Sequence, residues 1–314
     1  MRKVVVCGVT MLLSSAVSAR AEPFSGDGTT VFKNNAFSAD VSVGALRGKI
    51  KEFVFNPDGS LLSQLNWRLD NVAVVSGGLA WSPINWFTLG VRGRTNLSDS
   101  GTSDDFDFPG ALCGIDGPYC LSNSENTRVD NADSIDIYGS ATLYQKNGLK
   151  LSGLAGFRLD HYGFTAIGGT SNYSLPFPNS PSIIYDQWWE VPYVGLEASG
   201  QWNKFSLQAR ITGSLWADGR DRDDHRFREL LFTEDFRSSN YAGVSVKAGY
   251  AVAENILLTA GYDYDRWFLA TGLTTITEYG DGPNAPAITY PATSGYGGGS
   301  AETHTISAGV KVSY

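Results

Sequence analysis

Charge is scarce in this chain of 314 residues, where Asp, Glu, Lys and Arg together make up 18%. In soluble domains about a quarter of the residues are usually charged, so this chain is poorer in charge than they are. Cations are the rarer sign, with 24 Lys and Arg against 32 Asp and Glu. This balance excludes a nucleic-acid-binding protein, which needs a basic face for the phosphates. No apolar run of about 18 residues follows the first 21, which argues against a membrane-spanning helix.

Cysteine and histidine are scarce as well, with three of each. Cys7 lies near the N-terminus, so only Cys113 and Cys120 remain for the rest of the chain, on either side of a Gly-Pro turn. In an exported protein such a pair predicts one local disulfide. No further Cys or His lies close to them, so a zinc site is not expected there.

Glycine and aromatic residues are plentiful, with 36 Gly and 12% Phe, Trp and Tyr, and their spread excludes general disorder. Residues 1–21 have the features of a cleaved signal peptide: a basic start, an apolar stretch from Val4 to Val17 and the A-x-A site Ala19-Arg20-Ala21. Residues 22–314 then form a single domain. Its net charge becomes −11 instead of −8, because three cations and no acids leave with the signal peptide.

Apolar and polar side chains alternate along much of the chain. Leu207, Ala209 and Ile211 share one parity, for example, whereas Gln208 and Arg210 share the other. Such alternation is typical of strands with one apolar and one polar face. It predicts an all-β protein with ten strands, over residues 38–55, 61–82, 86–98, 133–145, 149–167, 188–202, 205–220, 240–252, 256–272 and 301–314.

The connections between these strands alternate in length. Tight turns lie at 82–85, 145–148, 203–204 and 253–255, and long polar segments at 99–132, 168–187, 221–239 and 273–300. This pattern predicts a ten-stranded antiparallel transmembrane β-barrel with short periplasmic turns and long extracellular loops. A soluble β-sandwich or barrel also alternates, but charged side chains would then have to fill a dry core. A wet or ion-paired lumen fits these side chains better.

Tryptophan residues are placed where two aromatic girdles would lie. Trp81 and Trp86 flank a short turn, and Trp188 and Trp189 follow a long predicted loop. A barrel of this size is narrow and filled by side chains, so function is expected in the long loops. The glycine-rich residues 295–299 lack the strand-to-helix context of a nucleotide-binding loop, and we interpret them as a flexible linker.

Acidic residues gather in two of the long loops, at 104–107 and 221–225. His225 lies in the second, where a neighbouring carboxylate would orient its ring and raise its basicity, as suits a general base that activates water. Strict alternation points Asp221, Asp223 and His225 outward, so either a bulge or a departure of the chain into a loop is expected to turn them inward. The residues leave two alternatives open: a solvated acidic face, or a site for a divalent cation.

These features together resemble the omptins, outer-membrane endopeptidases built as ten-stranded barrels. The resemblance extends over the mature chain, from residues 39–44 (ADVSVG) through 63–67 (SQLNW) and 192–196 (PYVGL) to the last strand. The family's Asp-x-Asp motif matches Asp105-Phe106-Asp107, and its Asp-x-His motif matches Asp223-Asp224-His225.

The resemblance implies an aspartic-type endopeptidase. Asp223 would orient His225, which takes a proton from water, while Asp105 and Asp107 would position the water or stabilise the tetrahedral centre. No cofactor and no metal are implied.

The family's acidic specificity pocket matches Glu52 and Asp221, which implies cleavage of peptides or proteins next to Arg or Lys. The resemblance also implies a monomer in the outer membrane of a Gram-negative bacterium, with its active site on the extracellular side. A catalytically weak barrel that acts as an adhesin or as a cation-binding surface protein is the alternative.

The chain departs from the omptins where they bind lipopolysaccharide. Residues 155–159 read Ala-Gly-Phe-Arg-Leu instead of Ala-Gly-Tyr-Gln-Glu, and two arginines are replaced by His161 and Trp188. Arg237 matches a basic member of the site. Lipopolysaccharide is therefore an expected partner and a candidate activator. We expect the dependence of protease activity on lipopolysaccharide, which is typical of the family, to be altered or lost.

Overall fold

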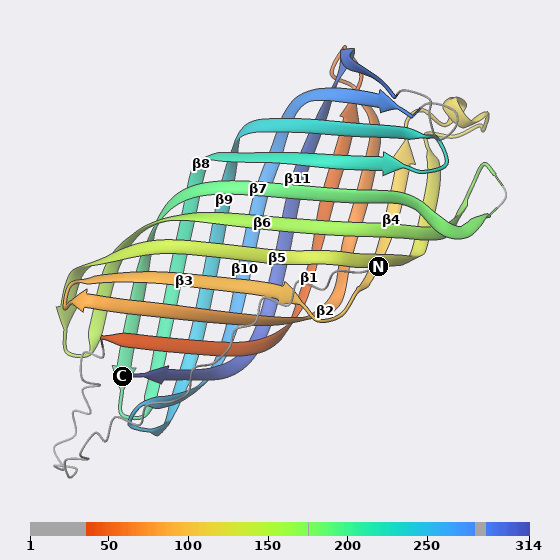
Figure 1. Cartoon of the computed structure of the whole chain (residues 1–314). Coiled ribbons are helices and arrows are strands. Elements are labelled where there is room, and N and C mark those ends of the chain that lie inside the picture. Colours follow the sequence, from red (N-terminus) through yellow and green to blue (C-terminus); the bar gives the residue numbers. More distant parts are fainter. Residues whose placement is uncertain (1–35, 175, 280–286) are drawn as a thin grey trace.

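In the residues that the structure describes, eleven antiparallel strands form a closed barrel (Figure 1). The computed structural model describes residues 36–174, 176–279 and 287–314, so the expected signal peptide lies outside them. The strands are β1 (Phe37–Phe55), β2 (Leu61–Ile84), β3 (Phe87–Asn96), β4 (Ser100–Asp107), β5 (Cys120–Lys146), β6 (Leu149–Ser171), β7 (Phe177–Trp202), β8 (Phe205–His225), β9 (Leu230–Ala253), β10 (Ile256–Glu278) and β11 (Ile288–Ser313). Their order is β1-β11-β10-β9-β8-β7-β6-β5-β3-β2-β4, and pairing of β1 with β2 closes the ring.

Strands β3 and β4 occupy one position in this ring, because both pair with β2 on one side and with β5 on the other. The barrel thus has ten strand positions, which confirms the predicted fold. A short 3-10 helix, η1 (Gly110–Cys113), follows β4. Within the described residues, no helix is long and apolar enough to cross a membrane.

At one end of the barrel the strands are much longer than predicted. The predicted long loops 99–132, 168–187, 221–239 and 273–300 are wrong over most of their length, because β4, β5, β7, β8, β9, β10 and β11 extend into them. Polar side chains occur on the outer face of these extensions as well as on the inner one. The alternation is therefore lost, although backbone pairing continues. The extended end lies at the upper right of Figure 1.

The half of the barrel next to the short turns has its apolar faces on the outside, as expected for a barrel in lipid. The outward side chains form an exposed band of Val, Leu and Ile, including Val41, Val43, Leu79, Ile137, Val194, Leu196, Ile211, Val246, Leu258 and Ile306. Ion pairs fill the lumen inside this band. Arg158 Nη1 lies 2.7 Å from Asp265 Oδ1, and Arg210 Nη2 lies 2.7 Å from Glu197 Oε2. The lumen is therefore ion-paired, as the sequence predicted.

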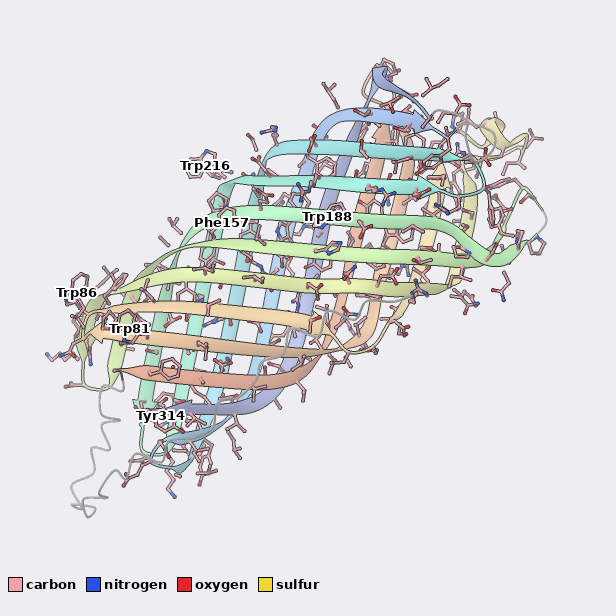
Figure 2. All side chains as sticks on the ribbon, in the orientation of Figure 1. Trp81, Trp86, Phe157, Trp188, Trp216 and Tyr314 are labelled. Carbon is pink, nitrogen blue, oxygen red and sulfur yellow. A yellow bond between two sulfur atoms is a disulfide. The ribbon has the colours of Figure 1, made fainter. Side chains whose placement is uncertain are left out.

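Tryptophans border this apolar band at two levels, and of these Trp81, Trp86 and Trp216 are exposed. Figure 2 shows Trp81 and Trp86 at the end with the short turns, and Trp188 and Trp216 further along the barrel. The prediction that Trp189 belongs to the outer girdle is wrong, since this side chain is fully buried inside the barrel. Consecutive residues of a strand point to opposite faces, so Trp188 and Trp189 cannot both face lipid.

Large aromatic side chains fill the barrel above the ion-paired lumen. Trp67 stacks on Tyr185 with ring centroids 5.1 Å apart and on Phe164 at 5.5 Å, and Trp189 packs against Trp267 at 6.4 Å. All five rings are fully buried. This layer separates the lumen from the extended end, and the acidic residues of that end lie above it.

Candidate functional site

A bulge in β8 turns the acidic segment into the barrel. Ser214 pairs with Tyr241, but the next pairing joins Ala217 to Ser239, so β8 contains one extra residue there. Leu215 and Trp216 are consecutive and both exposed. The inward parity changes at this point from even to odd numbers. The predicted bulge is confirmed: Asp221, Asp223 and His225 are inward and buried.

His225 and Asp223 form a close pair on the inner face of β8. His225 Nε2 lies 2.5 Å from Asp223 Oδ2, and its ring meets Phe232 edge to face. Burial lowers the pKa of His225, but the charge and hydrogen bond of Asp223 outweigh it, so the pKa lies above 6.5. The other ring nitrogen, Nδ1, is 3.5 Å from Nη1 of Arg228.

Asp105 and Asp107 lie on the wall opposite His225, and on a strand. The prediction that they belong to a loop is wrong, because β4 pairs residue by residue with β2 from Gly101 to Asp107. Ser63 Oγ donates a hydrogen bond to Asp105 Oδ1 at 3.2 Å. Burial and the nearby charge of Asp107 raise the pKa of Asp105 to about 7.

One cavity of about 160 Å³ joins the two walls and is lined by Asp105, Asp107 and His225. Tyr173 and Phe227 also line it. The structure therefore brings together the two motifs that the sequence places more than a hundred residues apart. A water molecule in this cavity would have the imidazole on one side and the carboxyl groups on the other.

Below His225, three buried carboxyl groups lie close together in a separate acidic cluster, made by Glu52 of β1, Asp221 of β8 and Glu234 of β9. Asp221 and Glu234 are direct pairing partners across the two strands. Tyr185 Oη donates to Asp221 Oδ2 at 3.1 Å, and Thr274 Oγ1 donates to Glu234 Oε1 at 2.8 Å. We call these three residues the acidic pocket.

Each of these carboxyl groups has one buried oxygen without a hydrogen-bond partner among the described residues: Glu52 Oε2, Asp221 Oδ1 and Glu234 Oε2. Burial and the neighbouring acids raise the pKa values of Glu52 and Asp221 well above their usual range. Burial, with the charge of Asp223, raises the pKa of Glu234 to about 8. Each of these oxygens is a buried acceptor with room for a hydrogen bond from an N–H group.

Glu234 was missed in the sequence because it falls in the predicted loop 221–239. The signal that could have found it is the hairpin itself: continuing the pairing of β8 and β9 through a tight turn places Glu234 opposite Asp221. Its space is provided by Gly297, where a Cβ atom would lie 1.7 Å from Glu234 Cδ. The interpretation of residues 295–299 as a flexible linker is wrong, because they lie in β11 and Gly297–Gly299 are buried.

Arg237 lies exposed on the outer surface of β9. The replaced lipid-contact positions form an aromatic group on β6 and β7. The His161 ring stacks on Trp188 at a centroid distance of 4.8 Å, and Arg220 lies over Trp188 at 5.3 Å. His161 Nε2 also lies 2.8 Å from Asp186 Oδ1. The lipid role of Arg237 remains a prediction.

Cys113 and Cys120 form the predicted disulfide, with an S–S distance of 2.04 Å. The bridge closes the loop after β4, and Cys120 is the direct pairing partner of Asp107. It therefore holds the segment that follows Asp105 and Asp107. Throughout the described part of the chain, no group of three or more His, Cys, Asp and Glu side chains is arranged to hold a metal ion.

An outer-membrane type of β-barrel with a His–carboxylate cleft inside its extended end is the class that these features define. The Omptin family model matches residues 33–314, so the chain belongs to the omptin family.

The relatives agree in sequence and in structure. The chain is 31% identical to the plasminogen activator of Yersinia pestis over 256 residues, covering 79% of this chain and 81% of that protein. It is 30% identical to the outer membrane protease OmpP of Escherichia coli, with 77% and 80% covered. The crystal structure of the outer membrane protease OmpT from Escherichia coli superposes with a TM-score of 0.79 at 26% identity, covering 88% of this chain and 96% of that chain. The protein is thus an outer-membrane protease of a Gram-negative bacterium.

Proposed function

We propose that this protease cleaves peptide bonds next to arginine or lysine, with water activated between His225 and the Asp105–Asp107 pair. The observation that carries the proposal is the shared cavity: a buried imidazole hydrogen-bonded to a carboxylate faces a second carboxyl pair across a space of about 160 Å³. This is the arrangement that a general base needs to hold and deprotonate a water molecule.

The proton transfers follow from the hydrogen bonds. Because Nε2 of His225 is bound to Asp223, Nδ1 accepts the proton from water, which takes the place of its 3.5 Å contact with Nη1 of Arg228. The resulting hydroxide adds to the carbonyl carbon of the scissile bond. The imidazolium, stabilised by Asp223, then gives its proton to the leaving amine as the C–N bond breaks. With a pKa of about 7, Asp105 can carry a proton and donate a hydrogen bond to the oxygen of the tetrahedral intermediate.

The acidic pocket gives the preference for a basic residue. A guanidinium group carries five N–H donors in one plane, and the pocket offers three buried carboxyl oxygens that lack donors. An ammonium group has three donors on a single nitrogen and matches separated acceptors less well. Arginine is therefore the preferred residue, and Glu234 acts together with Glu52 and Asp221.

The extended end carries the cavity lined by Asp105, Asp107 and His225. The short turns lie at the other end of the barrel, with the C-terminus (Figure 1). In outer-membrane barrels short turns face the periplasm, so the cavity opens to the extracellular side. The protein acts as a monomer. Lipopolysaccharide acts as an activator through Arg237, with weakened dependence because His161 and Trp188 replace basic side chains. No metal takes part.

The test is cleavage of a fluorogenic peptide containing Arg-Arg by the refolded protein, with and without lipopolysaccharide. We expect cleavage after arginine that chelation by EDTA leaves unchanged. The proposal is contradicted if the barrel shows the heat-modifiable gel migration of a folded barrel but does not cleave the peptide in either condition. That result would favour the adhesin or cation-binding alternative, for which the unpartnered carboxyl oxygens would bind a cation without chemistry.

A further inference from the structure

A second charged feature lies on the outer surface of the barrel, away from the cleft. Five cations from three strands surround a surface groove of about 550 Å³, and we call them the β1 basic patch: Arg47, Lys49 and Lys51 of β1, Arg68 of β2 and Arg266 of β10. Gly48 and Ala301 also line the groove. The proposed cleavage uses none of these residues.

The patch begins where the apolar band ends. On β1 the outward row passes from Val43 and Ala45 to Arg47. On the neighbouring β11 it passes from Ile306 to His304. Arg47 and His304 are direct pairing partners, so both rows change from apolar to polar at the same level. The cations therefore lie at the edge of the membrane, where lipid headgroups are found.

Only two of the five cations are neutralised by the protein. Arg68 is paired with Asp104, and Arg266 with Glu302. In the part of the chain that the structure describes, no carboxylate forms an ion pair with the three cations of β1. The guanidinium of Arg47 donates instead to the neutral side chain of Asn71.

Alternation explains how three free cations come to share one face. The sequence Arg47-Gly48-Lys49-Ile50-Lys51 has a basic residue at every second position, so all three project outward. Burial and the charges of Lys49 and Arg266 lower the pKa of Lys51, as expected where like charges crowd. Such crowding in a chain of net charge −8 is a local departure that an anionic ligand would compensate.

We propose that the β1 basic patch binds the phosphate groups of an anionic lipid whose acyl chains lie against the apolar band below it. Lysine and arginine at the edge of a membrane attract anionic headgroups, and phosphate accepts several charge-assisted hydrogen bonds at once. The apolar row of β1, with Val41 and Val43 exposed, offers the surface for the acyl chains. A free phosphate ion would use only the basic half of this surface.

This site differs from the one that the family resemblance implies. Arg237 lies on β9, and His161 and Trp188 lie on β6 and β7. The patch is instead centred on β1, which is paired with β11 and β2. Lipid binding at the patch is independent of protease activity and can be measured without a substrate.

The test is lipid binding by the folded full chain in a neutral detergent, measured by native mass spectrometry. The probes are lipid A with two phosphates, the same lipid without phosphate, and inorganic phosphate. We expect the phosphorylated lipid to bind most tightly. In the variant Arg47→Gln/Lys49→Gln/Lys51→Gln its affinity falls by about tenfold or more, because each basic residue at a membrane surface contributes separately.

A matched variant removes three cations from the short-turn end: Lys146→Gln/Lys150→Gln/Lys204→Gln. It retains the affinity, and so does the charge-preserving Lys49→Arg/Lys51→Arg. The series is repeated with Arg237→Gln, so that binding at Arg237 does not mask the patch. Equal binding of wild type and the β1 triple variant overturns the proposal. So do equal loss in the short-turn variant, equal binding of the dephosphorylated lipid, and complete competition by millimolar inorganic phosphate.

Discussion

The Nε2 atom of His225 lies 2.5 Å from Oδ2 of Asp223, two positions earlier on the same face of β8. Alternation along a strand, after a single bulge, is enough to bring these two side chains together inside the barrel. The pair is buried, so water does not compete for its hydrogen bond. Its geometry fixes which ring nitrogen is bound to the carboxylate, and the first two predictions depend on this pair.

Replacing Asp223 by Asn should reduce kcat by at least about a hundredfold, because the amide cannot stabilise the imidazolium that forms when water is deprotonated. The matched variant is Asp224→Asn. Asp224 is the next residue and is also buried, but its carboxylate is bound 3.0 Å from Arg226 Nη1. We expect that variant to lose less than about tenfold in a peptide-cleavage assay. Equal losses in the two variants, with both barrels heat-modifiable, would contradict a specific role for Asp223.

The titration of His225 provides a second test. Burial favours the neutral ring, but Asp223 favours the charged ring more strongly, so the pKa of His225 lies above 6.5 in the wild type. Removing Asp223 leaves burial as the main influence. The pKa should therefore fall below that of the wild type in Asp223→Asn, and the acid limb of kcat/KM should move to lower pH with it. The chain has only three histidines, so ring-proton NMR can follow His225, assigned by its absence in His225→Ala. An unchanged or higher pKa would show that Asp223 does not control the ring.

Alternation, together with the lengths of the connections, was sufficient to predict the barrel and its ten strand positions. It also led to the bulge, since Asp223 and His225 could reach the interior only if the parity of β8 changed. The disulfide followed from two cysteines with no other partner. These features depend on residues close together in the sequence.

Other features depended on pairing between distant strands, which alternation does not encode once both faces are polar. Glu234 seemed to lie in a loop, yet backbone pairing places it opposite Asp221. Gly297 seemed to belong to a linker, yet it provides the space for that glutamate. Trp189 was predicted to lie in the outer girdle together with its neighbour Trp188, yet it is fully buried inside the barrel.

Glu234→Gln tests the third carboxyl group of the acidic pocket. We expect kcat/KM for a substrate with arginine before the cleaved bond to fall about tenfold, because one charge-assisted hydrogen bond becomes a neutral one. The ratio of cleavage after arginine to cleavage after lysine should fall as well. Asp235→Asn is the matched control, since Asp235 is adjacent but exposed on the outer face. Unchanged selectivity in Glu234→Gln would exclude this residue from the pocket.

The raised pKa values of the pocket predict that arginine binding releases protons. A bound guanidinium favours ionised carboxylates, whereas the empty pocket holds protons up to the pKa of about 8 at Glu234. Affinity should therefore increase with pH over the range in which these carboxyl groups ionise, which includes the pKa of about 8 at Glu234. The inhibition constant of arginine amide, measured from pH 6 to 9, checks this. The slope should be smaller in Glu234→Gln, and a pH-independent constant in the wild type would show that the acids are already ionised.

The disulfide should support the water-binding wall but not the acidic pocket. Cys120 is the pairing partner of Asp107. The disulfide between Cys120 and Cys113 closes the loop that connects β4 to β5. On the chain-entropy estimate so small a ring contributes up to about 3 kcal/mol. In Cys113→Ser/Cys120→Ser we expect faster amide exchange over residues 108–121 and a fall in kcat. The inhibition constant of arginine amide should not change, because Glu52, Asp221 and Glu234 lie on other strands. If both kinetic constants change together, the bridge stabilises the whole extended end; if neither the exchange nor kcat changes, β4 holds Asp107 by strand pairing alone.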